Sequence, residues 1–175
     1  MRRLMVVTGP PGSGKTSAAL RVAEELRSRG IEVSGFVTRE VREGKTRVGF
    51  DIVELPTLSS LPLARKGQPS RYRLGAYAVY PDNLEKCGLP AIRLALERGV
   101  VLVVDEVGPM ELMSQKFVEV VGSAVSSVSR ALFTVHFRAR HPLIERLNGL
   151  ATLRVVMKFG DAESVARQAV DHLIG

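Results

Sequence analysis

The segment Gly9–Thr16, which reads Gly-Pro-Pro-Gly-Ser-Gly-Lys-Thr, has the residue types and the spacing of a phosphate-binding loop. Its glycines allow the backbone to curl so that successive amide groups point toward phosphate oxygens. Lys15 is a cation that can reach the β- and γ-phosphates of a nucleotide, and the Thr16 hydroxyl is a suitable ligand for Mg²⁺. Ser13 and Ser17 are expected to contribute mainly backbone amides. We therefore expect this loop to bind a triphosphate, with Lys15 taking part in catalysis and Thr16 binding the metal.

Two consecutive carboxylates, Asp105 and Glu106, follow the aliphatic run Val100–Val104. A phosphate-binding loop of this kind requires a metal-directing carboxylate near the end of a neighbouring strand. We therefore expect Asp105 to hold Mg²⁺, usually through water. Glu106 is expected to polarise an attacking water as a general base. Such a glutamate favours hydrolysis, because in many small-molecule kinases the acceptor group itself attacks the phosphate.

The next residues continue this loop. The pair Gly108-Pro109 fixes a tight backbone path, which places Val107 and Gly108 beside the expected γ-phosphate. Glu111 has two open roles: it could orient water or metal, or it could cap the helix that follows.

Polar side chains also follow the apolar run Ala131–Val135. Active sites in open α/β sheets lie at the carboxyl ends of strands, so Thr134 or His136 is expected to sense the γ-phosphate by hydrogen bonding. Arg138 or Arg140 could neutralise charge during phosphoryl transfer. A structural hydrogen bond for His136 and a solvated surface charge for each arginine are the alternatives.

Together these residues form one predicted site. Its catalytic residues are Lys15 and Glu106, and its metal ligands are Thr16 and Asp105. The predicted nucleotide-binding residues are Gly9, Pro10, Pro11, Gly12, Ser13, Gly14, Lys15, Thr16, Ser17, Asp105, Glu106, Val107, Gly108, His136 and Arg138.

Apolar runs and helical periodicity alternate along the chain. Strands are expected at residues 4–8, 31–41, 46–55, 71–80, 100–104, 131–135 and 153–157. Helices are expected at residues 16–28, 81–98 with Asp82 as N-cap, 114–128, 142–147 and after Asp161. Residues 56–70 contain prolines and small residues and are expected to form an irregular loop. This alternation predicts an α/β fold with a mostly parallel central sheet, to which residues 31–55 add an antiparallel hairpin.

The chain has 175 residues, which suits one domain spanning residues 1–175. Its only cysteine, Cys87, excludes an internal disulfide, and with three scattered histidines it does not form a zinc site. A cytoplasmic location is expected, because no apolar run is long enough for a membrane span or for the core of a signal peptide.

The net charge of +7 indicates a polyanionic partner. Aromatic residues make up 5% of the chain and tryptophan is absent, which disfavours a surface for stacking single-stranded nucleic acid. A face formed by Arg39, Arg42, Arg47, Arg71 and Arg73 could bind polyanions, although solvated surface charge is the preferred interpretation. Base selectivity is expected to be loose, because no guanine-reading Asn/Thr-Lys-x-Asp element follows a strand.

Three motifs together resemble a known family: Gly9–Thr16, the run Val104–Leu112, and Thr134-Val135-His136. The family comprises small nucleoside-triphosphatases described from thermophilic archaea and bacteria, with a human relative known as cancer-related nucleoside-triphosphatase. The hairpin residues Gly35–Phe50 are also similar to the family's second segment. The chain departs from the family pattern at Ser17, where relatives often carry threonine, and at Ala76, where they often carry lysine.

The resemblance implies a three-layer P-loop NTPase fold with a RecA-like strand order, in which one strand lies between the two phosphate-site strands. It also implies Mg²⁺-dependent hydrolysis of ATP, GTP, CTP, UTP and TTP to diphosphate and phosphate with little base preference. A small-molecule or nucleotide kinase, with residues 56–73 as a lid, is one alternative. A nucleic-acid-stimulated ATPase is another, suggested by the net charge. A nucleoside triphosphate is the expected partner, nucleic acid and membrane are not favoured, and a monomer is the default expectation.

Overall fold

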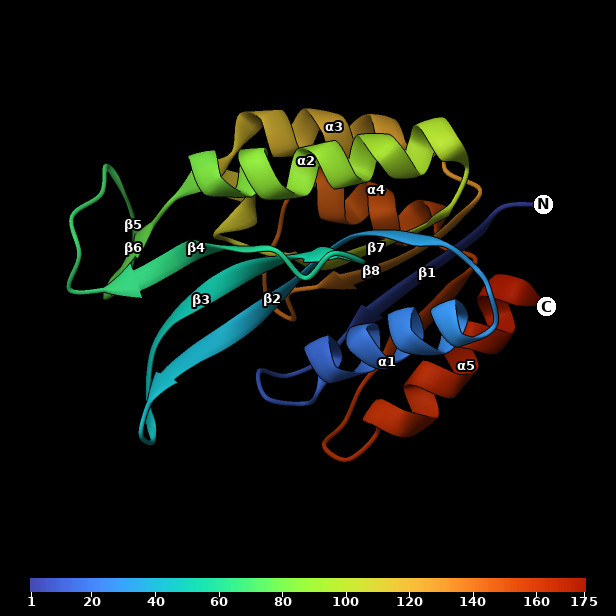
Figure 1. Cartoon of the computed structure of the whole chain (residues 1–175), viewed down its shortest axis with the longest axis horizontal. Helices are drawn as coiled ribbons and strands as arrows, with labels where there is room; N and C mark the ends of the chain where they lie inside the picture. Colours follow the sequence, from blue (N-terminus) through green and yellow to red (C-terminus); the bar gives the residue numbers. More distant parts are fainter.

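The computed structural model describes residues 1–175 as nine strands, five α-helices and a short 3-10 helix at Glu111–Met113. The strands are β1 (Arg3–Thr8), β2 (Val33–Glu43), β3 (Thr46–Leu55), β4 (Ser60–Lys66), β5 (Tyr72–Leu74), β6 (Tyr77–Val79), β7 (Val101–Val107), β8 (Arg130–Val135) and β9 (Leu153–Val156). The helices are α1 (Lys15–Ser28), α2 (Pro81–Arg98), α3 (Gln115–Ser127), α4 (Pro142–Leu150) and α5 (Ala162–Ile174). All nine strands form one sheet in the order β5-β6-β4-β3-β2-β7-β8-β1-β9 (Figure 1).

Pairing within this sheet is mixed. The strands β2, β7, β8, β1 and β9 are parallel neighbours, whereas β3, β4, β6 and β5 extend the sheet from β2 in antiparallel order. The prediction of a mostly parallel sheet was therefore wrong for the sheet as a whole, although the α/β class is confirmed. β8 lies between β1 and β7, as the family resemblance implies.

The additional antiparallel strands come from residues 56–80, where the sequence pattern did not predict them correctly. Residues 56–70 were expected to be irregular, yet β4 occupies Ser60–Lys66 within them. Pro62 was the misleading signal, because proline cannot donate to a sheet ladder. In the structure Pro62 pairs with Asp51 next to a register shift between Phe50 and Asp51, which is a position where proline is tolerated. Residues 71–80 form the two short strands β5 and β6 in place of the single expected strand.

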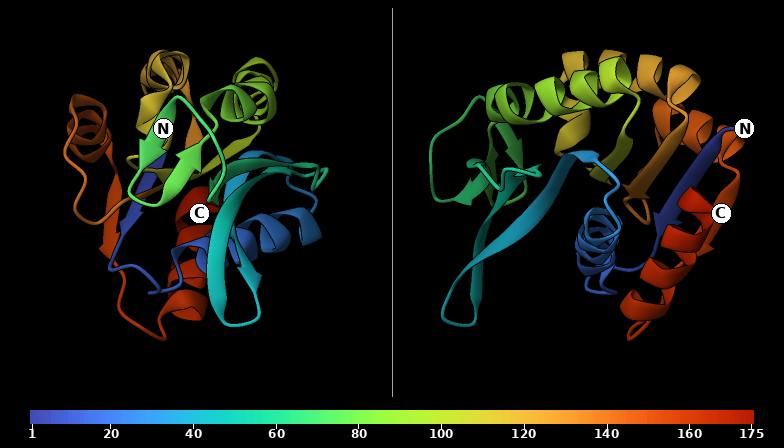
Figure 2. Two further views of the ribbon diagram at one scale, coloured as in Figure 1. Left: turned by 90° about the vertical axis from the view of Figure 1, so that its left-hand side faces the viewer. Right: turned by 45° about the vertical axis from the view of Figure 1, so that its right-hand side comes forward.

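Helices cover both faces of the sheet (Figure 2). One apolar cluster joins the sheet to α2, α3 and α4, and a second joins it to α1 and α5. Alternate residues of β7 belong to opposite clusters: Leu102 and Val104 to the first, Val101 and Val103 to the second. A continuous aliphatic strand is what such two-sided burial requires, so the three-layer arrangement follows from this part of the sequence.

The helix termini lie close to those expected, except for the N-cap of α2 and the end of α4, which runs to Leu150 where Leu147 was expected. The Ser114 hydroxyl caps α3 by accepting the N–H of Phe117 at 3.1 Å, and Asp161 stands at the N-cap position of α5. The prediction of Asp82 as N-cap was wrong, because α2 begins one residue earlier at Pro81, whose fixed φ suits a first helical position. No helix combines the length and the apolar character that crossing a membrane would need.

Gly35 sets how closely β2 approaches β7, and replacing it tests the packing of the sheet. A Cβ at this position would lie 1.8 Å from the carbonyl oxygen of Val103, and the backbone φ is 142°. We expect Gly35→Ala to lower the free energy of unfolding by about 3 kcal/mol, because β2 must move away from β7. The measurement is urea unfolding followed by circular dichroism.

The matched control is Gly149→Ala in α4, where nothing lies within 4 Å of the added Cβ. This change should alter the free energy of unfolding by less than about 0.5 kcal/mol, because Gly149 is exposed in the last turn of α4 and the added methyl group meets no neighbour. An unchanged unfolding midpoint for Gly35→Ala would contradict the close packing of β2 on β7.

Candidate active site

The phosphate-binding loop joins the end of β1 to the start of α1, as the sequence predicts. Gly14 has a φ of 99° directly before the helix, a left-handed conformation that favours glycine. The Ser13 N–H donates to the carbonyl oxygen of Pro10 at 3.1 Å and tightens the turn. The Lys15 ammonium donates to the carbonyl oxygen of Gly9 at 2.7 Å, so the cation folds back over the loop where phosphate oxygens would lie.

Asp105 is a buried carboxylate, with 1% of its surface exposed. It accepts hydrogen bonds from the Thr16 hydroxyl at 2.8 Å, the Thr134 hydroxyl at 2.5 Å and the Thr38 backbone N–H at 3.2 Å. Burial raises the pKa of Asp105, and these hydrogen bonds oppose the rise. Thr134 was expected to sense a γ-phosphate, but in the structure its hydroxyl holds Asp105. The backbone N–H of Thr38 carries no sequence signal and was missed.

The donor set around Thr16 fits Mg²⁺ bound together with a nucleotide. The Thr16 hydroxyl and the Asp105 carboxylate oxygen lie 2.8 Å apart, and both are hard oxygen ligands. No group of three or more His, Cys, Asp or Glu side chains could hold a metal by itself. Mg²⁺ commonly uses one or two protein ligands and completes its shell with phosphate and water, and this pair fits that pattern.

Glu106 lies at the end of β7, and its side chain retains 23% exposure where Asp105 is buried. Its carboxylate is 3.8 Å from the Lys15 ammonium. Burial and the neighbouring Asp105 raise the pKa of Glu106 to about 7, although Lys15 opposes the rise. A carboxyl group with a pKa near neutrality can accept a proton and release it again at physiological pH.

Glu111 and His136 bring two further titratable groups to the same place. Because Ser114 caps α3, Glu111 does not serve as that cap. Glu111 is buried, and burial together with Glu106 raises its pKa well above the usual range. The His136 Nδ1 accepts the backbone N–H groups of Arg138 and Ala139 at 3.2 and 3.1 Å. Burial, Lys15 and Arg138 lower the pKa of His136, which favours a neutral ring.

These groups surround a cleft of about 880 Å³ that runs from the phosphate-binding loop toward the β2–β3 hairpin. The predicted site residues that line it are Pro11, Gly12, Gly14, Lys15, Thr16, Ser17, Glu106 and His136. The predicted residues outside its lining are Gly9, Pro10, Ser13, Asp105, Val107, Gly108 and Arg138. Arg138 is exposed to solvent, so the geometry gives no support to its predicted contact with nucleotide.

Sequence reasoning missed the other half of the cleft. The residues from the hairpin and the strands beyond it are Thr38, Arg39, Glu40, Arg47, Phe50, Leu63, Leu74, Gly75, Ala76 and Tyr77. Arg39 and Arg47 were interpreted as solvated surface charge. The available signal was the resemblance of the hairpin to the family's second segment, but it did not show that β4, β5 and β6 would face the same cleft.

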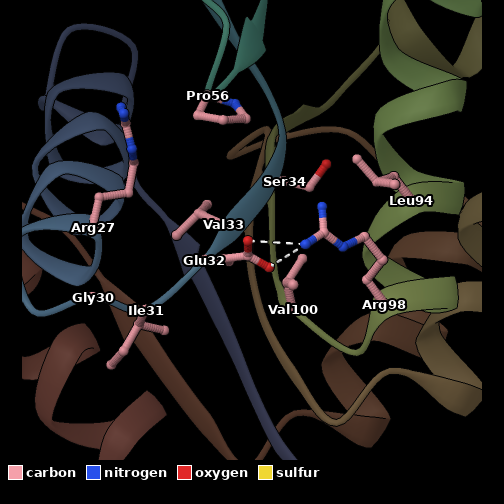
Figure 3. A pocket seen from close by; sticks show the side chains of 10 residues that line it. All are labelled: Arg27, Gly30, Ile31, Glu32, Val33, Ser34, Pro56, Leu94, Arg98 and Val100. Atoms are coloured by element: carbon pink, nitrogen blue, oxygen red, sulfur yellow. Dashed lines mark hydrogen bonds and ion pairs between the residues drawn. The ribbon is translucent and has the colours of Figure 1, made fainter.

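A second cavity, of about 340 Å³, lies at the opposite end of the parallel strands (Figure 3). It is bordered by the residues before β2 and β7, the amino-terminal ends of parallel strands, where α/β proteins rarely bind ligands. Two of its three charged lining residues, Glu32 and Arg98, are paired with each other at 2.9 Å. We therefore place the candidate active site in the larger cleft.

Comparison with known proteins identifies relatives over most of the chain. A family model described as NTPase matches residues 4–166. The chain is 45% identical over 140 residues to the nucleoside-triphosphatase THEP1 of Methanopyrus kandleri, a match covering 80% of this chain and 77% of that protein. It is 40% identical over 158 residues to the protein of the same name from Thermofilum pendens, covering 90% and 82% of the two chains.

Two solved structures share the fold. The crystal structure of THEP1 from the hyperthermophile Aquifex aeolicus superposes with a TM-score of 0.85 at 26% identity and covers 100% of both chains. The solution structure of a human cancer-related nucleoside triphosphatase superposes with a TM-score of 0.79 at 32% identity, covering 98% of this chain and 96% of that one. The family resemblance drawn from the motifs is thus confirmed, and the chain belongs to the NTPase family.

Proposed function

We propose that this protein hydrolyses nucleoside 5′-triphosphates to diphosphate and phosphate in a Mg²⁺-dependent reaction with loose base specificity. The observation that carries the proposal is the position of Glu106 in the cleft, 3.8 Å from Lys15 of the phosphate-binding loop. This pairing brings a proton acceptor next to the cation that reaches the γ-phosphate. The relatives named as nucleoside-triphosphatases support the same reaction.

In the proposed mechanism, the loop amides and Lys15 hold the β- and γ-phosphates. The Glu106 carboxylate accepts a proton from water as the water oxygen bonds to the γ-phosphorus. The bond from that phosphorus to the bridging oxygen breaks, and the nucleoside diphosphate departs. When bound by Thr16 and Asp105, Mg²⁺ supplies charge neutralisation at the phosphate oxygens. His136 donates from Nε2 to the γ-phosphate, because its Nδ1 is engaged as an acceptor.

The role of Glu106 is tested by Glu106→Gln, which keeps the shape of the side chain and removes its basicity. We expect kcat to fall by about a hundredfold or more while nucleotide binding persists, because general-base catalysis is lost. The measurement is steady-state phosphate release together with binding of a non-hydrolysable ATP analogue. Glu119→Gln, an exposed position on α3, is the matched control and should leave both unchanged. Undiminished phosphate release by Glu106→Gln would refute the assignment.

The metal requirement is tested by removing divalent cations with EDTA. Phosphate release should stop and should return when Mg²⁺ is added. Thr16→Ala should raise the half-saturating Mg²⁺ concentration by about tenfold, because one oxygen ligand is lost. Thr46→Ala, on the exposed start of β3, is the control and should not shift it. Full activity in EDTA would contradict the proposal.

Loose base specificity is supported by the surface on the β9 side of the loop. Phe159 is 70% exposed, and one carbon of its ring lies 3.7 Å from the position that a Cβ would take at Gly12, so the ring is next to the phosphate-binding loop. An exposed ring stacks on any base and reads no particular hydrogen-bond pattern. We expect kcat/KM values for ATP, GTP, CTP, UTP and TTP to agree within about tenfold. A preference of several hundredfold for one base would show that the base is read by hydrogen bonds.

A further inference from the structure

The cleft has a second half that the binding of a triphosphate does not use. We call it the ring chamber and define it by Arg47, Phe50, Leu63, Leu74 and Tyr77, which come from β3, β4 and β6 and from the end of β5. The whole cleft measures about 880 Å³, near the upper end of the range for small-molecule sites. A second small molecule therefore has room beside the triphosphate.

The position of the ring chamber relative to the γ-phosphate follows from the strand order. The phosphate-binding loop follows β1, and Glu106 is the penultimate residue of β7. The ring chamber is lined by β3, β4, β5 and β6, which lie beyond β2 in the strand order, so β7 stands between these strands and β1. Lys15 and Glu106 mark the γ end of a bound triphosphate. In phosphoryl transfer the attacking and leaving oxygens are roughly in line, so the attacking group comes from the side away from the β-phosphate. The chamber is on that side.

The chemistry of the ring chamber suits a flat aromatic molecule. The rings of Phe50 and Tyr77 have centroids 5.6 Å apart and planes inclined by 57°. The Arg47 guanidinium lies 5.0 Å from the Phe50 centroid and 5.8 Å from that of Tyr77. Arg47 Nε also donates to the Tyr77 hydroxyl at 2.9 Å, which holds the guanidinium against the two aromatic rings. A second cation, Lys66, lies 5.5 Å from the Tyr77 centroid. Aromatic and guanidinium planes of this kind stack on heteroaromatic rings.

We propose that the ring chamber binds the planar heteroaromatic ring of an alcohol of the nucleoside class, and that the protein transfers the γ-phosphoryl group to a hydroxyl of this acceptor. The inference rests on the proposed function, because the donor is the triphosphate at the phosphate-binding loop. The exposed Phe159 on the β9 side gives the donor's own base a separate surface. The base of the donor therefore does not need the ring chamber.

The step uses the groups already in the cleft. The acceptor's hydroxyl proton passes to the Glu106 carboxylate as its oxygen forms a bond with the γ-phosphorus. The bond between that phosphorus and the bridging oxygen breaks, and its electron pair leaves with the nucleoside diphosphate. The products are the phosphorylated acceptor and the diphosphate. When the ring chamber is empty, water takes the acceptor's place and hydrolysis results.

The test incubates the full chain with Mg²⁺, ATP labelled at the γ-phosphate, and adenosine, guanosine, cytidine, uridine or thymidine. We expect label to appear in at least one nucleoside monophosphate. Tyr77→Ala should lower the ratio of transfer to phosphate release by about tenfold, the size expected for the loss of one base–aromatic stack. Tyr72→Ala, a tyrosine on β5 outside the cleft lining, is the matched control and should keep the ratio.

A calorimetric titration distinguishes the acceptor proposal from a second explanation, in which the donor's own base occupies the ring chamber. The nucleoside is titrated into protein saturated with Mg²⁺ and a non-hydrolysable ATP analogue. Binding to this complex supports the proposal, whereas loss of nucleoside binding on saturation overturns it. If phosphate release proceeds but no nucleoside is labelled or bound, the acceptor proposal fails and the hydrolase proposal stands. If no triphosphate is cleaved at all, the proposed function itself fails.

Discussion

The buried carboxylate of Asp105 is the interaction on which the site depends. Its hydrogen-bond donors come from α1, β8 and β2, so one side chain joins the phosphate-binding loop to two strands of the sheet. Hydrogen bonds to a charged group contribute roughly 1.5–3 kcal/mol each, while burying an ionised carboxylate costs several kcal/mol. The bonds therefore offset the cost of burial without a large surplus. The carboxylate is best explained by what it positions, namely the Thr16 hydroxyl.

Fixing Asp105 also fixes its neighbour. Asp105 is held in the interior, and Glu106, the next residue at the end of β7, reaches the cleft beside Lys15. The two adjacent carboxylates thus have different surroundings and different chemistry, although their residue types are similar. Glu111 adds a third carboxyl to this cleft, and its mutual repulsion with Glu106 favours protonation of at least one of them near neutral pH.

The sequence was sufficient where chemistry is carried by contiguous residues. Gly9–Thr16 joins β1 to α1, and the Asp105–Glu106 pair lies in the last three residues of β7, so a local pattern located both. The sequence was insufficient where the site depends on which strands pair and in what register. Phe50 and Tyr77 meet only because β4 and β6 extend the sheet, and Pro62 concealed β4. The Thr38 amide could not be found, because every residue except proline carries the same group.

The antiparallel extension also bears on the unusual positive charge of the chain. In and near the cleft, Arg39 pairs with Asp51 at 3.6 Å and Arg47 with Glu40 at 3.3 Å, so these cations are not free counter-charges for a polyanion. The Arg47–Glu40 pair is exposed on both sides, and pairs of this kind contribute only about 0–1 kcal/mol. The hairpin therefore holds both arginines at the lining of the cleft through ion pairs with its own carboxylates.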